Sequence, residues 1–531
     1  MTLISLDFAL LWLVTGILYY AFPLKKRWTV LLGSSLVFYF IGGISTGYFM
    51  LLTTVCIWLV ALWLDKHNNI QKAYLAAHPE LTRDEKKQYR LSVQHKKRLI
   101  LALGLVVCFG FLVFLKYFNF LSGQAFSILH LFGVKAAAPK INLALPLGIS
   151  FYTLQATSYI IDVYRGKLAA EKNPAKIALF VCFFPQIIQG PIGRYGALAP
   201  QLFEGNRFDP VKFRHGLELA LWGIIKKLTI AEYIGLIADN VFDNYTQYTG
   251  FVIFLGSVAY GFQVYADFSG GMDIISGIAE TFGIEMAVNF ERPYFARSIA
   301  EFWRRWHITL GAWMRDYIFY PLSLSKAFAK MGKKTKKVFG TYIGKMLPTF
   351  LASFISFMLV GIWHGSSWKY IAYGLWNSVI ITGSILLDPV YKKVIERLKI
   401  NTDAFSWKLF QILRTFFLVS IGRIFSRAAS LRISLSMLKR MFSEFNPWIF
   451  TDGTVLNLGA SGKQLVLIFV MLLVLLVVGI MQESGMKLRK KLDEQNMLFR
   501  WIFIIAAVCF VLIYGAYGGD FNASDFVYQQ F

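Results

Sequence analysis

The chain has 531 residues, of which 56 % are hydrophobic, 17 % aromatic and only 16 % charged, and its mean hydropathy is +0.53. This profile excludes an ordinary soluble domain and indicates a membrane protein that crosses the bilayer several times. The net charge is +25 at pH 7. Because the basic residues lie between apolar runs, they indicate cytoplasmic loops and contacts with membrane lipids, and not a nucleic-acid partner.

The first third of the chain predicts several membrane crossings. The first apolar run has no basic region before it and no small-residue cleavage site, so we expect a retained span and not a signal peptide. Basic clusters at 25–27 and 96–98 are expected in the cytoplasm, which places the N-terminus outside. The second run is long enough for a hairpin that turns at 42–47. The apolar runs are 8–24, 28–64, 99–115 and 141–161.

The middle of the chain is less regular. Residues 183–195 contain two prolines and two glycines, and broken backbone at membrane depth survives only inside protein or beside a water-filled cavity. We therefore expect a re-entrant segment that lines a cavity. Asp209 and Pro210 predict a helix N-terminus. The apolar run 244–266 is expected to end at the acids and glycine pair of 267–273.

Residues 298–316 predict one amphipathic helix that lies in the membrane interface or lines a cavity. Ser298 and Glu301 have the spacing of a capping box. Trp303 and His307 lie four residues apart and therefore share a stripe of this helix. A simple aromatic anchor at the membrane surface is the alternative interpretation.

His364 is the only ionisable residue between Lys345 and Lys369, in an apolar stretch long enough to span a membrane. An ionisable group at membrane depth predicts a functional role, and imidazole can take and return a proton near neutrality. A helix-end histidine bound to a carbonyl group or to interfacial water explains the stretch equally well. The sequence of this stretch alone does not decide between them.

The last third of the chain predicts further apolar elements and an outside C-terminus. Basic segments at 330–337 and 487–500 are expected as cytoplasmic loops. The apolar elements are 371–387, 413–419, 465–481 and 501–519. The four cysteines, Cys56, Cys108, Cys182 and Cys509, lie singly in apolar runs without a metal spacing, so we expect buried hydrophobic side chains and no metal.

Six short motifs follow one another between about residues 100 and 420. They are PLGISFY at 146–152, FPQ with GPI at 184–192, YADFSG at 265–270, NF at 289–290, FWRRWHITL at 302–310 and GIWHG at 361–365. In this order they resemble the membrane-bound O-acyltransferase (MBOAT) family. The resemblance is to its bacterial branch, which includes the alginate O-acetylation and teichoic-acid D-alanylation membrane proteins.

The resemblance implies an all-α polytopic membrane protein with the MBOAT fold, about 11–13 membrane helices, re-entrant segments and a central funnel or tunnel. It implies an acyltransferase in which His364 is the catalytic histidine and His307 the second active-site histidine. The other five histidines match no family position and are expected to be bystanders. The residues expected to line the site are Trp363, Trp303, Arg304, Asp267, Ser269, Gln186 and Asn289.

We divide the chain into N-terminal helices with a basic loop (1–98), a catalytic core (99–425) and a C-terminal extension (426–531). The extension ends in an aromatic-rich segment that resembles the motif of a small single-span protein of the D-alanylation system. We hypothesise that Tyr528 is an acyl relay and that Phe526 and Phe531 are apolar anchors. An extracellular tail without defined structure is the alternative.

The resemblance further implies acyl transfer, with acetyl favoured, from a cytoplasmic thioester such as acetyl-CoA to an extracytoplasmic polysaccharide or cell-wall polymer. No permanently bound cofactor is expected. The implied partner is an SGNH-hydrolase-like acetyltransferase, and the implied location is the bacterial cytoplasmic membrane. D-alanyl transfer from a carrier-protein thioester to teichoic acid is the first alternative. A transporter or lipid flippase is the second, although the sequence lacks the internal repeats that would favour it.

Overall fold

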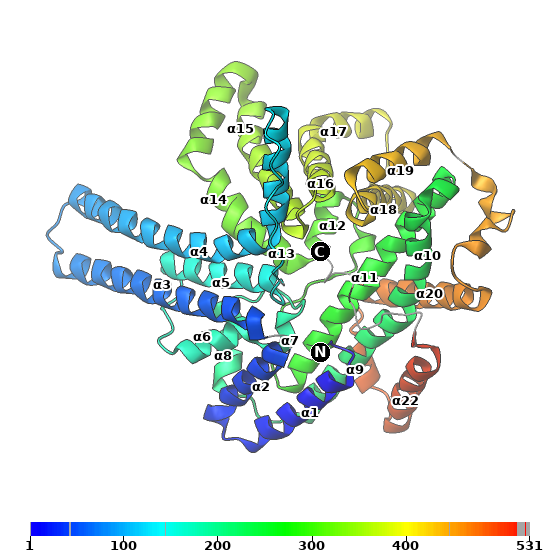
Figure 1. Ribbon diagram of the computed structural model, residues 1–531, viewed down its shortest axis with the longest axis horizontal. Coiled ribbons are helices and arrows are strands. Elements are labelled where there is room, and N and C mark those ends of the chain that lie inside the picture. Colours follow the sequence, from blue (N-terminus) through cyan, green and yellow to red (C-terminus); the bar gives the residue numbers. More distant parts are fainter. Residues whose placement is uncertain (1, 42–43, 144, 445, 518–525, 527–531) are drawn as a thin grey trace. The chain divides into compact units, whose positions relative to one another are not determined.

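The computed structural model describes residues 2–41, 44–143, 145–444, 446–517 and 526, with only the backbone described at 44–46. These residues form helices joined by turns and short 3₁₀ or π-helical segments, and no β-strand occurs among them (Figure 1). The chain forms two compact units. The first unit is Met1–Leu217 with Ile275–Ala287, and the second is Glu218–Ile274 with Val288–Phe531.

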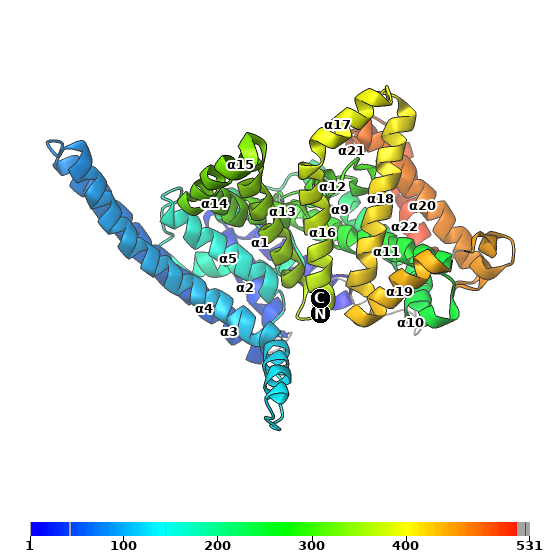
Figure 2. The same ribbon diagram turned by 90° about the horizontal axis from the view of Figure 1, so that it is seen from above.

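The first unit contains the N-terminal helices, and α3 and α4 lie side by side in it (Figures 1 and 2). The long apolar run is divided as expected, because α2 ends at Ile41 and α3 begins at Ile44, and residues 42–43 of the predicted turn lie outside the described residues. The helices are α1 (Leu6–Ala21), α2 (Arg27–Ile41), α3 (Ile44–Ala77), α4 (Arg83–Leu131), α5 (Ile149–Tyr164), α6 (Pro174–Cys182), α7 (Phe184–Ile187), α8 (Tyr195–Glu204) and the start of α9 (Pro210–Ile225). The expected crossing at 141–161 is shorter than predicted, because α5 begins only after Gly148 in the left-handed conformation (φ +69°).

The predicted break within 183–195 is present in the first unit. α6 ends at Cys182, α7 is a single four-residue turn, and residues 188–194 are not helical. Residues 181–193 are all buried, as irregular backbone in a membrane protein requires. The helix start at Asp209 is also confirmed, because its carboxylate accepts the backbone N–H of Val211 at 2.9 Å.

The second unit contains the remaining helices, except that α11 passes into the first unit at Ile275, and a π-helix at Lys226–Ala231 that joins α9 to α10. The helices are α10 (Glu232–Asp243), α11 (Gly250–Thr281), α12 (Ile299–Arg305), α13 (Ile308–Met314), α14 (Tyr320–Ser323), α15 (Lys326–His364), α16 (Trp368–Leu386), α17 (Asp388–Arg397), α18 (Phe405–Arg427), α19 (Leu431–Ser443), α20 (Gly462–Glu483), α21 (Leu488–Asp493) and α22 (Met497–Tyr514). α16, α18, α20 and α22 confirm the apolar elements predicted in this part of the chain. The basic segment 330–337 is helical and belongs to α15, which is interrupted at Gly340 (φ +83°).

The expected break at 267–273 was wrong, because α11 continues without interruption to Thr281. The two acids stay in the helix because lysines of the π-helix pair with them. Lys227 Nζ lies 2.7 Å from Asp267 Oδ1, and Lys226 Nζ lies 2.8 Å from Asp273 Oδ2. The glycine pair serves close packing, since a Cβ atom on Gly270 would lie 2.8 Å from the carbonyl oxygen of Gly223.

The single helix expected at 298–316 was also wrong. α12 ends at Arg305, α13 begins at Ile308, and His307 between them is in the left-handed region (φ +47°, ψ +52°). Ser298 caps α12 as predicted and accepts the N–H of Glu301 at 3.1 Å. The Glu301 carboxylate does not return to Ser298, however, and accepts the N–H of Arg297 instead.

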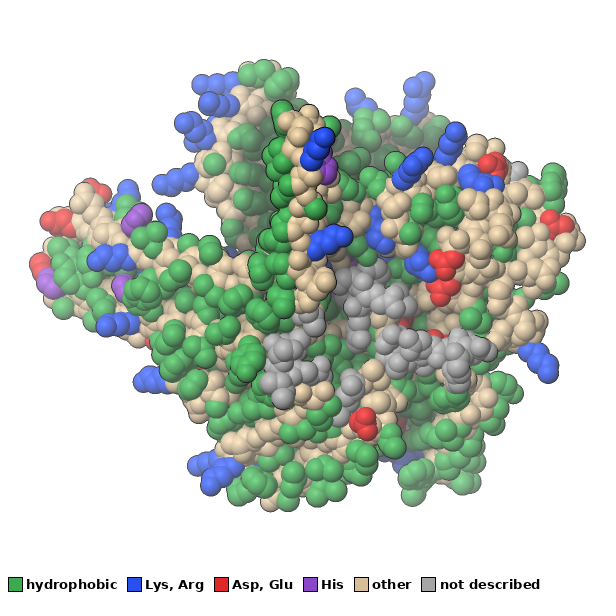
Figure 3. All heavy atoms as spheres, in the orientation of Figure 1, with side chains coloured by type: hydrophobic (Ala, Val, Ile, Leu, Met, Phe, Trp, Pro, Cys, Tyr) green, Lys and Arg blue, Asp and Glu red, His purple; other side chains and the backbone are tan. Residues whose placement is uncertain are grey.

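Seven helices of the described residues are long and apolar enough to cross a membrane, or up to eight if the bent pair α16–α17 is one span. They are α3, α4, α11, α15, α18, α20 and α22. The total is lower than the about 11–13 expected, because apolar helices such as α1, with 16 residues, are shorter than a full span. Hydrophobic side chains are exposed along α3 and α4, as lipid contact requires, and basic side chains gather around α14 and α15 (Figure 3). The protein is therefore an all-α, multi-pass membrane protein.

α15 and α16 form a close hairpin whose packing positions His364. The two backbones approach at Gly361 and Gly374, where a Cβ atom on Gly361 would lie 2.5 Å from the carbonyl oxygen of Tyr370 and 2.6 Å from Gly374 Cα. No side chain fits there without separating the helices. The crossing lies one turn before His364, so it determines where the last turn of α15 presents the imidazole.

We expect Gly361→Ala to separate α15 from α16, to lower the melting temperature of the purified protein and to abolish the acyl transfer that the family resemblance implies. Gly383→Ala is the matched control on α16, because no atom lies within 4 Å of the position its Cβ would take. This substitution should leave stability unchanged or raise it by about 0.5–1 kcal/mol. Equal melting temperatures and activities for the two variants would contradict the role of the glycine crossing.

Candidate active site

The chain reverses at His307 because residues before and after it pair with the segment at 289–291. Glu291 N–H donates to the Arg305 carbonyl at 2.9 Å, and Ile308 N–H donates to the Asn289 carbonyl at 3.0 Å. Phe290 and Trp306 form the bridge between them. A non-glycine residue in the left-handed region costs about 1–2 kcal/mol, so the surrounding contacts must hold His307 there.

Asn289 determines which nitrogen of His307 carries the proton. Its Oδ1 accepts the backbone N–H of Thr309 at 3.0 Å and the Thr309 hydroxyl at 2.9 Å, so this atom is the oxygen. His307 Nδ1 lies 3.3 Å from the same Oδ1 and therefore donates to it. The other ring nitrogen, Nε2, then carries the lone pair of a neutral imidazole.

His307 is fully buried. Burial lowers the pKa of His307 well below its usual value, and the nearby His364 lowers it further. Its imidazole is consequently neutral at physiological pH. A neutral ring that donates through Nδ1 has no second N–H to offer to a substrate.

His364 is the last residue of α15 and lies in the same aromatic wall as His307. The ring of Trp363 is 5.8 Å from that of His307 and 5.2 Å from that of His364, measured between centroids. The Tyr373 ring lies 5.7 Å from His364, and the Phe268 ring meets His307 edge-on at 5.0 Å. Both histidines therefore belong to one largely apolar site within the second unit.

Trp303 supports this wall. Its indole Nε1 donates to Asn377 Oδ1 at 3.0 Å, and Asn377 Nδ2 donates to the Tyr373 carbonyl at 2.9 Å. The indole N–H is thus committed to the protein. Trp303 links α12, which leads into His307, with the helix that carries Tyr373.

Asp267 and Ser269 are buried beside the π-helix in a cluster of paired charges. Lys227 bonds Asp267 and also Glu232, at 2.5 Å, while Lys226 bonds Ser269 at 2.9 Å as well as its acid. Neither residue has a described contact with the two histidines. Asp267 precedes Phe268, which does contact His307, so the cluster supports the site indirectly by holding the segment that carries Phe268.

Three predicted site residues remain. Arg304 is exposed, whereas its neighbour Arg305 forms an ion pair with Glu301 at 2.8 Å. Gln186 is buried in the first unit, where its amide donates to Gln155 Oε1 at 2.7 Å. Tyr528 lies outside the described residues.

Four further residues of this region were not predicted from the sequence: Phe268, Tyr373, Asn377 and Arg423. Phe268 stood inside a recognised motif, and Arg423 is the single charge in the apolar run from Thr415 to Ser426. Both signals were available in the sequence. Tyr373 and Asn377 carry no such signal, because they are ordinary residues of an apolar helix.

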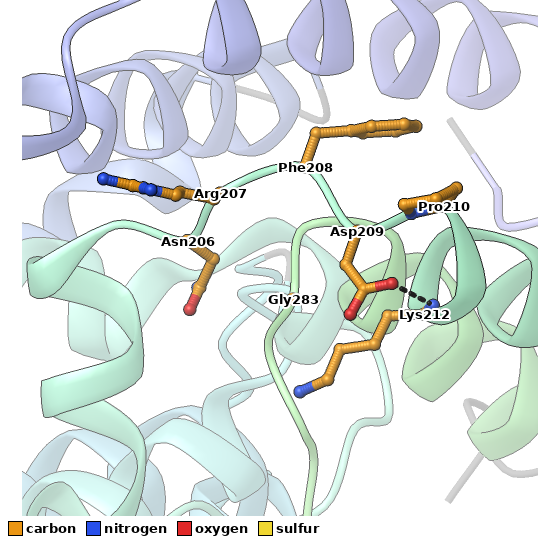
Figure 4. Close-up of a pocket in the computed structure, with 7 residues that line it drawn as sticks. All are labelled: Asn206, Arg207, Phe208, Asp209, Pro210, Lys212 and Gly283. Carbon is orange, nitrogen blue, oxygen red and sulfur yellow. Dashed lines mark hydrogen bonds between the residues drawn. The ribbon is translucent and has the colours of Figure 1, made fainter.

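A pocket in the first unit does not have the chemistry of this site (Figure 4). Its lining residues are Asn206, Arg207, Phe208, Asp209, Pro210, Lys212 and Gly283. The Asp209 carboxylate already accepts the first N–H groups of α9, and the Lys212 ammonium pairs with Glu285 at 2.9 Å. Two charged groups of the pocket, those of Asp209 and Lys212, are thus engaged within the protein.

The model of the MBOAT, membrane-bound O-acyltransferase family, matches residues 168–421. The chain is 34 % identical over 392 residues to a probable alginate O-acetylase of Pseudomonas aeruginosa, covering 74 % of this chain and 69 % of that protein. This chain belongs to the MBOAT family. It is accordingly an acyltransferase. In the part of the chain that the structure describes, no group of three or more His, Cys, Asp or Glu side chains is placed to hold a metal ion.

Two further relatives of this MBOAT protein have different acceptors in their names. One is the peptidoglycan O-acetyltransferase of Helicobacter pylori, 31 % identical over 372 residues, or 65 % of each chain. The other is the teichoic acid D-alanyltransferase of Bacillus subtilis, 29 % identical over 251 residues, or 46 % of this chain and 60 % of that protein. The alignments with the two O-acetyl relatives are longer and have a higher sequence identity than the alignment with the D-alanyltransferase.

Proposed function

We propose that the protein moves an acyl group, acetyl in the favoured case, from a cytoplasmic thioester such as acetyl-CoA toward O-acylation of an extracytoplasmic polysaccharide or cell-wall polymer. The observation that carries this proposal is the aromatic site that holds a neutral, buried His307 next to His364. The names and longer alignments of the O-acetyl relatives support acetyl over D-alanyl transfer. Family membership gives the transporter alternative no support.

His364 serves as the general base in this proposal. It takes the proton of an attacking hydroxyl, whose oxygen forms a bond to the thioester carbonyl carbon. When the carbon–sulfur bond breaks, the imidazolium returns the proton to the leaving thiolate. The products are an ester and a free thiol. His307 supports this step as a neutral acceptor, since Asn289 occupies its only N–H.

The C-terminal segment supplies that hydroxyl through Tyr528. Two contacts in the second unit support docking of the segment near the site. Ala516 N–H donates to the Leu228 carbonyl of the π-helix at 3.0 Å, and Lys227 Nζ lies 4.6 Å from the centre of the fully buried Phe526 ring. Lys227 bonds Asp267, whose neighbour Phe268 contacts His307.

Tyr528 follows Phe526 by two residues, which span at most about 7 Å. A phenol (pKa about 10) is easier to deprotonate than a sugar hydroxyl, and its ester is a better donor for a second transfer. Acyl-Tyr528 would then be attacked by a hydroxyl of the polymer, with an SGNH-hydrolase-like partner as catalyst. Tyr528 leaves as the free phenol.

We further propose the bacterial cytoplasmic membrane as the location, with both termini outside and residues 65–98 and 487–500 in the cytoplasm. The positive-inside bias of the basic segments supports this orientation. Single cysteines introduced into the two basic segments of a cysteine-free variant should react only with membrane-permeant reagents. Labelling of either segment by a membrane-impermeant reagent from outside would show that the proposed orientation is wrong.

We expect His364→Ala to lower acyl transfer at least about 100-fold while the protein inserts into membranes normally, because it removes the general base. His95→Ala, which changes an exposed histidine outside the site, is the control and should retain full activity. The measurement is acetate incorporation into the extracellular polymer at equal protein levels. Activity within a few-fold of the wild type would exclude His364 as the base.

We expect Tyr528→Phe to keep folding, insertion and donor binding but to lose acylation of the polymer. Mass spectrometry of the C-terminal peptide from working cells should detect an acyl adduct on Tyr528 that is absent in His364→Ala. Phe526→Ala should weaken both signals, since it removes the ring that contacts Lys227. Normal acylation by Tyr528→Phe would exclude the relay and leave the segment a docking role alone.

A further inference from the structure

Two arginines of α18 lie one turn apart and differ in their partners. Arg427 Nη2 lies 2.6 Å from Asp239 Oδ1 and 3.6 Å from Asp243 Oδ1. Arg423 is only 5 % exposed, yet none of the described carboxylates forms an ion pair with it. A buried cation normally has an anionic partner, because desolvation of the charge is otherwise uncompensated.

The unpartnered atoms of Arg423 form one particular edge of the guanidinium. Nε and Nη2 have no hydrogen-bond partner within the described part of the chain. Their two N–H groups are parallel, and this edge can bind both oxygens of a carboxylate, or two oxygens of a phosphate, side-on. Arg423 therefore offers an unused bidentate site.

Aromatic side chains lie around the guanidinium. Arg423 Cζ lies 4.3 Å from the centre of the Trp306 ring, and the Tyr294 phenol is a hydrogen-bond partner of the guanidinium, which leaves Nε and Nη2 unpartnered. Neutral rings attract a cation through their faces but do not neutralise it. Gly422 permits the approach of α18 to α16, since its Cβ would lie only 3.1 Å from Trp376 Cδ1 (Figures 1 and 2).

The same rings connect Arg423 with the two histidines. Trp306 precedes His307 in the chain, and the Tyr373 ring lies 5.7 Å from the ring of His364. Arg423 therefore contacts the residue that precedes His307, and the second unit also holds Tyr373 beside His364. An anion held by Arg423 would be part of the molecule that reacts at this site.

We propose that Nε and Nη2 of Arg423 bind an anionic oxygen group, a carboxylate or a phosphate, carried by one of the two substrates. This inference rests on the proposed acyl transfer. The phosphate would come from a coenzyme A donor, and the carboxylate from an acidic sugar of the acceptor. In either case Arg423 determines substrate specificity and is not the base.

The test uses membrane vesicles from producing cells, so that the full chain and its partner are present. Donors are acetyl-CoA and S-acetylpantetheine, which lacks the nucleotide phosphates, and acceptors are a uronate oligosaccharide and its carboxyl-reduced form. Arg423→Gln removes the charge, and Arg423→Lys keeps the charge but removes the bidentate edge. Arg427→Gln is the matched control.

If the donor is bound, both Arg423 variants should raise the KM for acetyl-CoA at least tenfold and leave that for S-acetylpantetheine unchanged. If the acceptor is bound, they should lose the preference for the uronate over its reduced form. Arg427→Gln should change neither KM by more than twofold. Folded Arg423 variants with all KM values within twofold of the wild type would overturn the proposal, as would an equal loss of kcat with every substrate.

A second measurement, of ligand binding by melting temperature, does not depend on catalysis. It tests the site on the wild type even if an Arg423 variant does not fold or the wild type does not transfer acetyl groups. Coenzyme A or glucuronate should raise the melting temperature of the wild type more than pantetheine or methyl glucoside does, and Arg423→Lys should remove that difference. No difference between anionic and neutral probes in the wild type would overturn the site. Failure of the proposed function is distinguishable from failure of the Arg423 site, because the wild type would then consume no thioester.

Discussion

The structure depends on one constraint, which is that a charged or polar group inside a membrane protein needs a hydrogen-bonding or ionic partner. The lysines at 226 and 227 satisfy it for two acids of α11. Because those acids are neutralised, α11 remains helical where its sequence has two carboxylates and a glycine pair. The uninterrupted helix then holds Phe268 against the ring of His307. A charge cluster without a described contact to either histidine thereby shapes the site.

The same constraint explains the chemistry of the two histidines. Asn289 accepts three donors, from Thr309 and His307, so the neutral tautomer of His307 is selected by hydrogen bonds and by burial together. Around it the wall consists of Trp303, Trp363 and Tyr373, and the Trp303 indole N–H is engaged within the protein. Such a wall excludes water and strengthens the remaining electrostatic interactions.

Local signals in the sequence predicted much of the fold. Long apolar runs identified α16, α18, α20 and α22, and the prolines and glycines of 183–195 identified the broken segment. The continuity of α11 could not be predicted, because the lysines that stabilise Asp267 and Asp273 lie about 40 residues earlier in the chain. The break at His307 likewise depends on pairing with residues 289–291, whereas the residues at 298–316 by themselves favour one helix.

The candidate site, like the fold, could be predicted only in part. His364 stood out as an isolated ionisable group in an apolar stretch, and His307 lay in a recognised motif. Asn377 and Tyr373 were missed because their roles arise from the packing of α16 against Trp303 and His364. Arg304 and Arg305 are adjacent in the motif, but only the second is paired, since the helix turns the first toward the surface.

The π-helix at Lys226–Ala231 has a consequence for the evolution of this chain. A π-turn contains one residue more than an α-turn. The extra residue lets two consecutive lysines both reach acids of α11. Removal of one residue would restore an ordinary α-helix and rotate all that follows by about 100°. Related sequences that align with α9 and α10 without a gap should therefore keep both lysines, whereas a one-residue deletion in this segment should coincide with loss of an acid from α11.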